Sequence, residues 1–412
     1  MKPVLVLDAD TDQSLAVVRA LSENEIPIHV AGSGRRGPGY WSLRAGRRFV
    51  YPSPLRFPKE FLKFILRLSQ EKHYEAIFPL TDSTTTVLQQ FRSKLAHLPI
   101  AMADKESYFK VSDKFHTHKL ARAAGLYVPQ TFYPNSHAEL EEILPRLEFP
   151  VVLKPRYSRF YDEQTDAVIP GDTRVIFDEK EFVTHFAQAR QGSVFPCIQA
   201  WVPGIGFGVE LLMKDQKVIA QFCHRRIREM DPLGSGSSAC VSVPPREDLV
   251  EASIKMLRSC HYEGAAMVEF RMDEKGGKAW FIEINGRFWG SLALPLACGI
   301  NFPYLYLQAF VRNQPVAVTT DYPLGIQARS LWKETARFLS ILKGRPLSWK
   351  GSFPTRGEGV KEYFTAFFKK GQVYCDFELK DPLPGLVKTL SVFLETFFHA
   401  LLRPFQILKG IK

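Results

Sequence analysis

The sequence predicts an α/β amino-terminal domain (residues 1–110), a central α+β domain (111–312) and a mainly helical carboxy-terminal extension (313–412). Short apolar runs alternate with helix-spaced runs near the amino terminus, and two long apolar runs flank a Gly-containing turn further on. The last segment is amphipathic. The chain has 412 residues, 45% of them hydrophobic and 24% charged, which is an ordinary composition for a globular protein of several domains.

The amino-terminal domain alternates strands and helices. The predicted strands are Val4–Leu7, Ile28–Ala31 and Ala76–Leu80, and the predicted helices are Ser14–Glu23 and Pro58–Lys72. This βαβαβ order predicts an open, Rossmann-like parallel sheet, in which ligands lie beyond the carboxyl ends of the strands. The polar turns 8–12 and 81–83 fall there. The first turn is acidic and lacks glycine, which disfavours a dinucleotide site.

Antiparallel sheet and helices follow after about residue 115. We expect helices at Ser112–Gly125, Glu179–Arg190 and Asp248–Cys260, and strands at Pro150–Pro155, Pro196–Ala200, Gly208–Met213 and Lys217–Cys223. The two long strands Ala265–Asp273 and Lys278–Ile284 flank the turn Glu274-Lys275-Gly276-Gly277, which predicts a hairpin.

Cysteine usage and charge limit the classes of function. The six cysteines are scattered without metal-ligand spacing, so we expect a reducing, cytoplasmic compartment and neither a disulfide framework nor a structural zinc site. The first apolar run is too short for a signal peptide, and no uncharged apolar stretch is long enough for a membrane span. The net charge is +11, but no nucleic-acid-binding motif accompanies it, so we expect no nucleic acid partner.

The hairpin carries a set of polar side chains. Glu283 and Asn285 alternate onto one face of the second strand, and Glu269 reaches that face from the first strand. Carboxylate and amide oxygens are the ligands that Mg²⁺ prefers. Arg287 points the same way, where it would stabilise charge on a transferred phosphoryl group. A solvent-facing hairpin with incidental acids is the alternative.

Glu269 and the run Glu283-Ile284-Asn285-Gly286-Arg287 resemble the metal-binding signature of the ATP-grasp superfamily, of the carbamoyl-phosphate synthase and biotin carboxylase type. The resemblance covers residues 110 to 312 and implies a pre-ATP-grasp domain before them, an ATP-grasp fold, and ATP with Mg²⁺ or Mn²⁺ as cofactors. The family's usual proline is replaced by Gly286, which permits the same turn.

Upstream markers appear in the family's order. Lys114 resembles the first nucleotide-binding lysine, and Lys154 resembles the lysine that holds the ATP phosphates. The segment Gln199-Ala200-Trp201-Val202 resembles the hinge whose backbone holds adenine, and Glu210 resembles the acid near the ribose. Two features depart from the family pattern. Gln199 replaces a common glutamate, and the loop after Lys154 is not rich in Gly and Ser. Arg156, Arg159 and Arg174 are candidates to contact phosphate there, or to recognise an anionic substrate.

A basic run, His224-Arg225-Arg226-Ile227-Arg228, precedes a Gly/Ser-rich segment. It is either a basic strand edge beside a flexible loop or a clamp for the substrate carboxylate beneath a lid. For the clamp we favour Arg226 over Arg225. Alternation along the strand does not settle which of the two faces inward.

The resemblance implies a ligase that activates a carboxylate as an acyl phosphate for attack by an amine, releasing ADP and phosphate. Lys154, Arg226 and Arg287 would be its catalytic residues. The alternatives are an ATP-grasp kinase, whose phosphorylated product is stable, and a non-catalytic nucleotide-binding scaffold at a membrane. The expected partners are a small-molecule carboxylate and an amine.

The carboxy-terminal segment Leu386–Lys409 predicts an amphipathic helix. Its polar stripe consists of Lys388, Glu395, His399 and Arg403. Such a helix packs on the body of the protein or in a homodimer interface, or lies on the inner face of the membrane. Residues Leu331–Leu342 are amphipathic as well.

Overall fold

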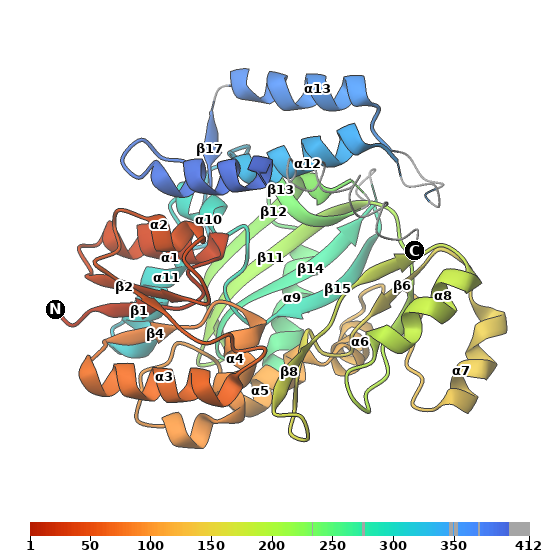
Figure 1. The fold of residues 1–412 in the computed structure, drawn as a ribbon, viewed down its shortest axis with the longest axis horizontal. Coiled ribbons are helices and arrows are strands. Elements are labelled where there is room, and N and C mark those ends of the chain that lie inside the picture. The colour runs from red at the N-terminus through yellow and green to blue at the C-terminus, as the bar shows by residue number, and fades with distance from the viewer. Residues whose placement is uncertain (233, 274–276, 346–348, 350–352, 370, 395–412) are drawn as a thin grey trace, which may run out of the picture.

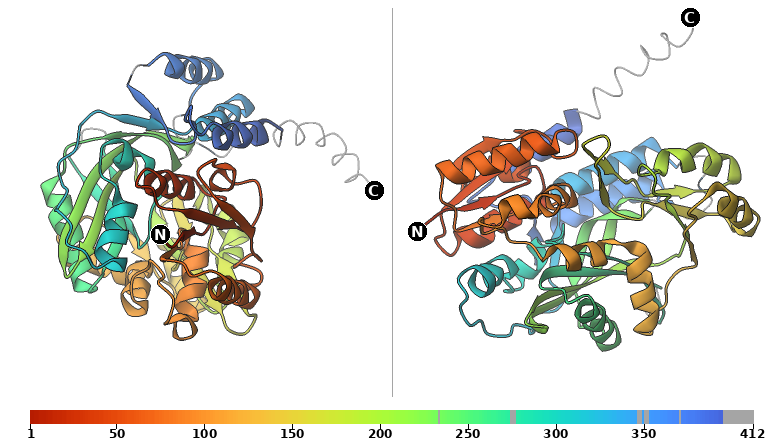
Figure 2. Two further views of the ribbon diagram at one scale, coloured as in Figure 1. Left: turned by 90° about the vertical axis from the view of Figure 1, so that its left-hand side faces the viewer. Right: turned by 90° about the horizontal axis from the view of Figure 1, so that it is seen from below.

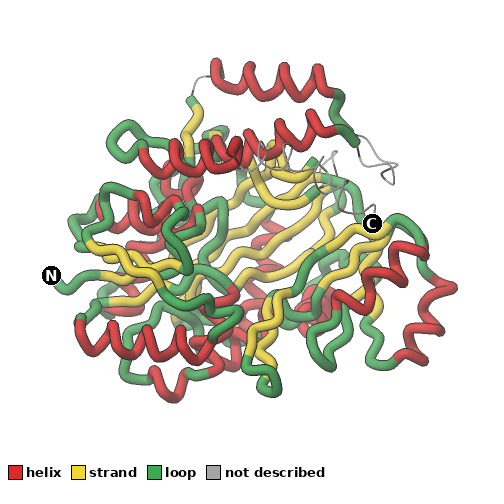
Figure 3. The backbone as a smooth tube through the Cα atoms, in the orientation of Figure 1, coloured by secondary structure: helices red, strands yellow, loops and turns green. Residues whose placement is uncertain are grey.

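The computed structural model describes the chain except for residues 233, 274–276, 346–348, 350–352, 370 and 395–412. The described residues form a four-stranded parallel sheet, a four-stranded and a seven-stranded antiparallel-rich sheet, and a two-stranded hairpin (Figures 1 and 3). The α/β and α+β classes expected from the sequence are confirmed.

The amino-terminal sheet has the strand order β3-β2-β1-β4, with every pair parallel. Its elements are β1 (Val4–Val6), α1 (Asp12–Ser22), β2 (Ile28–Gly32), α2 (Pro38–Trp41), β3 (Arg47–Val50), α3 (Pro58–Glu71), β4 (Ala76–Phe78) and α4 (Asp82–Gln90). Alternating strand residues pack against α1 on one face and against α3 and α4 on the other. The predicted strands and helices of this domain are therefore confirmed.

Asp8, at the end of β1, joins that strand to β4. Its carboxylate accepts hydrogen bonds from the backbone N–H groups of Leu80 (2.8 Å) and Thr81 (2.9 Å) and from the Thr84 hydroxyl (2.7 Å). The acidic turn thus stabilises the sheet from within. The next acid along this edge, Asp82, begins α4.

A smaller sheet has the strand order β5-β10-β6-β9. It comprises β5 (Thr131–Phe132), β6 (Val151–Lys154), β9 (Arg174–Ile176) and β10 (Cys197–Ala200), with α7 (His137–Ile143) and α8 (Glu179–Phe186) alongside. The segment after Lys154 forms the hairpin β7 (Arg159–Asp162) and β8 (Ala167–Pro170). This hairpin contacts α4, so it lies against the amino-terminal domain.

The large sheet has the strand order β15-β14-β11-β12-β13-β16-β17. Its strands are β11 (Ile205–Lys214), β12 (Lys217–Asp231), β13 (Ser235–Ser242), β14 (Gly264–Met272), β15 (Ala279–Asn285), β16 (Gln327–Arg329) and β17 (Gln372–Tyr374). One face packs on α5 (Lys105–Ser112), α6 (Lys114–Ala123) and α9 (Glu247–Ser259). The predicted hairpin is confirmed as β14 and β15.

Shorter helices complete the described chain. They are α10 (Ala293–Ala297), α11 (Phe302–Tyr306), the π-helical turn Leu307–Val311 and the 3₁₀ turns Arg92–Leu95, Leu144–Arg146, Ala187–Ala189 and Ala366–Phe368. Side chains of α10 and α11 share one core cluster with α1 and with the large sheet. This shared core fixes the amino-terminal domain against the large sheet.

The carboxy-terminal region contributes both strands and helices. The strands β16 and β17 extend the large sheet, which the sequence analysis did not anticipate. The helices α12 (Leu331–Lys343), α13 (Arg356–Thr365) and residues 383–394 lie along one side of the molecule (blue in Figures 1 and 2). The amphipathic segment Leu331–Leu342 is therefore confirmed as a helix. Of the helix predicted over 386–409, residues 395–409 lie outside the described residues.

Among the described residues, no helix is both long enough and apolar enough to cross a membrane.

Candidate functional site

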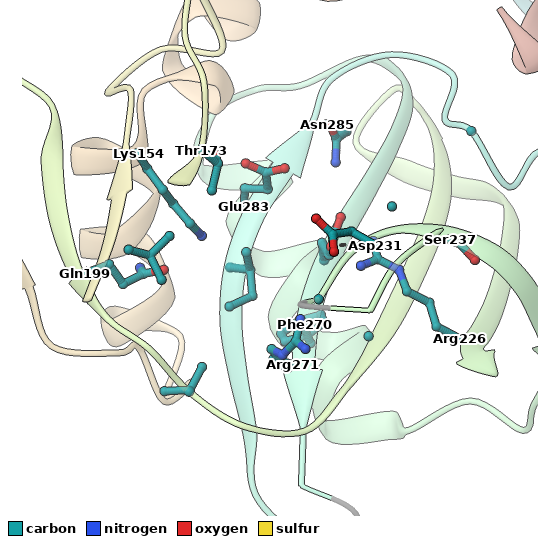
Figure 4. A pocket seen from close by; sticks show the side chains of 18 of the residues that line it. Lys154, Thr173, Gln199, Arg226, Asp231, Ser237, Phe270, Arg271, Glu283 and Asn285 are labelled. Atoms are coloured by element: carbon teal, nitrogen blue, oxygen red, sulfur yellow. Dashed lines mark hydrogen bonds and ion pairs between the residues drawn. The ribbon is translucent and has the colours of Figure 1, made fainter. Parts of the chain in front are cut away.

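A cavity of about 590 Å³ lies between the small sheet and the large sheet. Strands β6 and β10 provide one wall and β12, β14 and β15 the other, as Figure 4 shows for Lys154 and Gln199 opposite Glu283 and Asn285. The predicted site residues that line it are Lys154, Gln199, Ala200, Trp201, Val202, Arg226, Glu269, Glu283, Asn285 and Arg287. The residues singled out from widely separated motifs therefore meet in one space.

The proposed metal ligands lie on adjacent strands. Glu269 of β14 is directly opposite Glu283 of β15, and Asn285 follows on the same face. Each of the three contacts a basic side chain, Asn285 through Arg287. Glu269 lies 2.5 Å from Arg226, and Glu283 lies 3.3 Å from Lys114. Two carboxylates and an amide oxygen facing one cavity fit a hard divalent cation, which takes oxygen ligands.

Electrostatics keep Glu283 ionised. Burial alone would raise the pKa of Glu283, but the neighbouring Lys114 and Lys154 ammonium groups lower it further than burial raises it. A charged carboxylate is the form that binds a metal ion. Burial has the opposite consequence for Lys154, whose pKa it lowers.

Lys114 contacts an acid of the site from outside the cavity lining, and its contact with a nucleotide stays a prediction. Its side chain is buried at the start of α6, and it contacts Glu283 without lining the cavity. It is in position to hold an acid of the site. In this structure it does not face the space in which a nucleotide would lie.

Arg287 links the site to the amino-terminal domain. Its guanidinium donates to Asp82 (2.9 Å) at the start of α4 and to the side-chain oxygen of Asn285 (3.0 Å). Burial alone would raise the pKa of Asp82, but the Arg287 charge and hydrogen bond lower it on balance. Asp82 was predicted only to lie at a ligand-binding edge, and the structure gives it a specific partner.

The arginines after Lys154 separate into distinct roles. Arg156 pairs with Asp113 at the cap of α6 (2.7 Å), and Arg159 donates to Ser83 of α4 (3.0 Å). Arg174 lines the cavity. Of these three candidates, Arg174 is the one placed to contact a ligand.

Strand β12 presents Arg226 to the cavity, while Arg225 is exposed. Gly206 of β11 makes room for Arg226, since a Cβ there would lie 2.4 Å from its Cδ. His224, the first residue of the basic run, lines the cavity as well. Among the charged lining residues, sequence reasoning gave no role to Asp231, Arg271 and Lys333. Alternation from Glu269 would have found Arg271. Lys333 comes from α12, and only the tertiary fold brings it here.

Glu210, predicted to lie near a ribose, does not line the cavity. It shares a strand face with Gly206 and Gly208, but it lies further along β11 and is fully buried. Its Oε1 lies 2.9 Å from Nδ1 of His224 and accepts a hydrogen bond from the Ser291 hydroxyl (3.1 Å). His224 and Ser291 line the cavity, whereas Glu210 does not, and the contact of Glu210 with a ribose stays a prediction.

The chain resembles known proteins in sequence. The family model described as "ATP-grasp in the biosynthetic pathway with Ter operon" matches residues 198–331. Mitochondrial pyruvate carboxylase of Rattus norvegicus is 27% identical over 192 residues, which is 43% of this chain and 15% of the relative. The carbamoyl phosphate synthase large chain of Pyrococcus furiosus is 22% identical over 275 residues, which is 62% of this chain and 23% of the relative. The matched region thus spans less than a quarter of either relative.

Solved structures share the fold. The biotin carboxylase domain of Hydrogenobacter thermophilus 2-oxoglutarate carboxylase superposes with a TM-score of 0.61 at 16% identity, covering 79% of this chain and 73% of that one. The ADP complex of an N5-carboxyaminoimidazole ribonucleotide synthetase gives 0.59 at 15% identity, covering 90% and 98%. The L-amino acid ligase of Bacillus licheniformis gives 0.55 at 16% identity, covering 76% and 75%.

The family match begins inside the strand that carries Gln199 and spans the whole β14–β15 hairpin with its acids. The solved relatives extend the likeness to most of the chain. Residues 198–331 thus match an ATP-grasp family model, and the chain has the fold of these solved relatives, with the site residues gathered in one cavity between the two sheets.

Proposed function

We propose that the protein is an ATP-dependent ligase that activates a carboxylate as an acyl phosphate and transfers the acyl group to an amine. The observation that carries the proposal is the meeting of Glu269, Glu283 and Asn285 with Lys154 in one cavity beside the hinge strand β10. Several relatives are named as carboxylases, synthetases or ligases, which supports the same class of reaction.

The nucleotide would occupy the end of the cavity formed by the small sheet. Backbone groups of Gln199–Val202 would hold adenine, and Lys154 would contact the phosphates. Glu269, Glu283 and Asn285 would hold Mg²⁺ or Mn²⁺. Such an ion, when bound, neutralises phosphate charge and orients the phosphoryl group.

The reaction would proceed in two steps. A carboxylate oxygen of the substrate attacks the γ-phosphorus while the bond to ADP breaks, and Lys154 and Arg287 stabilise the charge that develops. Arg226 orients the substrate carboxylate from the opposite wall. The amine nitrogen then attacks the acyl carbon, the C–N bond forms, and phosphate leaves with the electrons of the C–O bond.

The test is ADP release by the purified protein with Mg-ATP and a pool of carboxylic acids and amines. Glu283→Ala should reduce substrate-dependent ADP release at least about 100-fold, because it removes a proposed ligand of the metal ion that neutralises phosphate charge. Glu251→Ala, an exposed acid on α9, is the matched control and should match the wild type. ADP with a stable phosphorylated product would support the kinase alternative, and wild-type protein that binds no Mg-ATP would support the scaffold.

We also propose that the enzyme works in the cytoplasm and contacts the inner face of the membrane through its carboxy-terminal helix. Residues 383–394 expose Leu383, Leu386, Leu390, Phe393 and Leu394, which share one face at helical spacing. Residues 313–412 hold 15 Lys and Arg against 8 Asp and Glu, and this excess favours an anionic lipid surface.

Vesicle sedimentation tests the membrane contact. The full chain should bind phosphatidylglycerol vesicles and bind phosphatidylcholine vesicles less. The double variant Leu386→Ser/Leu390→Ser should reduce binding at least about fivefold. Leu324→Ser, 55% exposed in the loop before β16, is the control for a lost surface leucine. If the wild-type protein does not bind vesicles but has twice the monomer mass in solution, and the double variant is a monomer, this helix would instead be a homodimer interface.

A further inference from the structure

His224 of the cavity wall and Glu210 beside it have no role in the proposed reaction so far. His224 lies on the cavity surface of β12, and Glu210 lies on the neighbouring strand β11, two residues beyond Gly208, which is opposite His224. The two side chains are 3% and 0% exposed, and Nδ1 of His224 is 2.9 Å from Oε1 of Glu210. A carboxylate in contact with one ring nitrogen orients the imidazole and leaves the other nitrogen, Nε2, free for chemistry.

Strand β11, next to β12, leaves space for the imidazole ring of His224. Gly208 is opposite His224 in the β11–β12 ladder, and a Cβ at Gly208 would lie 2.4 Å from Cε1 of the ring. Gly206 makes the same allowance for Arg226. Glycine inside a strand weakens it, and often marks a place where another group must approach closely. The Gly206-Phe207-Gly208 run therefore provides space for two neighbouring cavity residues.

The carboxylate is held in place by more than the ring. The Ser291 hydroxyl donates to Oε1 of Glu210 at 3.1 Å, and Ser291 itself lines the cavity. Burial raises the pKa of Glu210, and the neighbouring His224 opposes that rise. An acid buried at this depth needs a partner such as an imidazolium to remain ionised. If the imidazole of His224 gains a proton, the carboxylate of Glu210 is close enough to balance its charge.

We propose that His224, oriented by Glu210, is the catalytic base of the second step, a role that rests on the proposed ligase reaction. As the amine nitrogen attacks the acyl phosphate, the C–N bond forms and the C–O bond to the phosphoryl group breaks. Phosphate leaves with the electron pair, and the N–H proton passes to Nε2 of His224. Glu210 is the positioning residue, and its negative charge balances the imidazolium.

The proposal separates the two steps of the reaction, so the experiment uses two nucleophiles. A pool of dicarboxylic, hydroxy and amino acids supplies the carboxylate, and either hydroxylamine or a pool of primary alkylamines is added. Hydroxylamine is largely unprotonated at neutral pH and is a strong nucleophile that can pass its proton to water, so its attack depends little on an enzyme base. Alkylamines are protonated at neutral pH and must lose a proton before they attack, so they depend on the base. His224→Asn should keep hydroxylamine-dependent ADP release within about twofold and lose about 100-fold in amide formation with alkylamines.

Variants at the partner residue refine the test. Glu210→Gln should lose about tenfold in amide formation, again with hydroxylamine turnover retained. His29→Asn, a half-buried histidine of β2 that does not line the cavity, is the control. If His224→Asn is poorly folded, His224→Ala replaces it, and added imidazole, which can enter the space left by the ring, should restore part of the amide formation.

Three outcomes would overturn the proposal. Equal losses with both nucleophiles would assign His224 to binding or to the first step. Unchanged amide formation would leave the Glu210–His224 pair a structural contact between β11 and β12. A failure of imidazole to restore either histidine variant would exclude a proton-transfer role. Wild-type protein that releases no ADP with either nucleophile would instead contradict the proposed ligase function.

Discussion

Asp8 and Asp82 follow neighbouring strands of the same parallel sheet, yet they serve different parts of the molecule. Asp8 is buried at the end of β1 and accepts hydrogen bonds from Leu80, Thr81 and Thr84. Asp82 begins α4 after β4 and pairs with Arg287, which lines the cavity. The first acid stabilises the sheet that carries it, and the second connects that sheet to the site.

The largest expected effect is on stability at Asp8. Asp8→Ala leaves the backbone N–H groups of Leu80 and Thr81, and the hydroxyls that donate to the carboxylate, without their acceptor, so we expect a loss of about 3 kcal/mol in the free energy of unfolding. Urea unfolding measures it. The kcat of the protein that remains folded should match the wild type. A large fall in kcat at unchanged stability would break the comparison, because Asp8 would then act on the site.

Asp82→Asn should show the reverse pattern. Without the charge of Asp82, the guanidinium of Arg287 is held less firmly. Displacing a charge-stabilising group by about 1 Å costs about 100-fold in rate. We therefore expect kcat for ADP release to fall by about that factor, with KM for ATP changed less. Glu75→Gln, at an acid next to β4 that pairs with Arg312 (2.6 Å), is the control for loss of an inter-domain contact, because neither residue lines the cavity. Equal kcat in Asp82→Asn and wild type would remove Asp82 from any role at the site.

The pH dependence of stability sharpens the contrast between the two acids. Arg287 outweighs burial and leaves the pKa of Asp82 below its ordinary 3.8, so the stability from this pair is present above about pH 3.8 and is lost as the pH falls through the lower, folded-state pKa. Burial raises the pKa of Asp8 above 3.8, so its folded form takes up a proton first, and its contribution weakens as the pH rises through that raised value.

Unfolding measured from about pH 3 to pH 6 should therefore distinguish Asp8→Asn from Asp82→Asn. Asp82→Asn should remove a component of stability that declines toward acid pH, and Asp8→Asn one that declines toward neutral pH. The same sign of change in both variants would show that one of the two acids is in a different ionic state from the one its contacts imply.

Local patterns predicted much of the fold. Helix α3 and strand β1 followed from apolar periodicity, and β14 and β15 from two apolar runs around a glycine turn. Strand β3 was missed because Arg47 and Arg48 are exposed at the sheet edge, so it has no buried pattern. Helix α4 was missed because its Thr-rich sequence has low helix propensity.

The site was predictable where it depends on alternation along one hairpin, as for Glu269, Glu283 and Asn285. It was not predictable where it depends on how deeply a side chain is buried or on elements distant in the sequence. Glu210 occupies the expected strand face, but it is fully buried against His224 and does not line the cavity. Lys333 reaches the cavity from α12, and Asp82 reaches Arg287 from the amino-terminal domain. Only tertiary packing produces these contacts.

The central claim is that the cavity activates a carboxylate with ATP. The most direct test supplies the purified protein with Mg-ATP, hydroxylamine and the pool of carboxylic acids, and measures ADP, free phosphate and hydroxamate together. The account predicts that all three appear in equal amounts, that they depend on the acids, and that Glu283→Ala abolishes them. A stable phosphorylated product without free phosphate, or wild-type protein that binds no Mg-ATP, would contradict it.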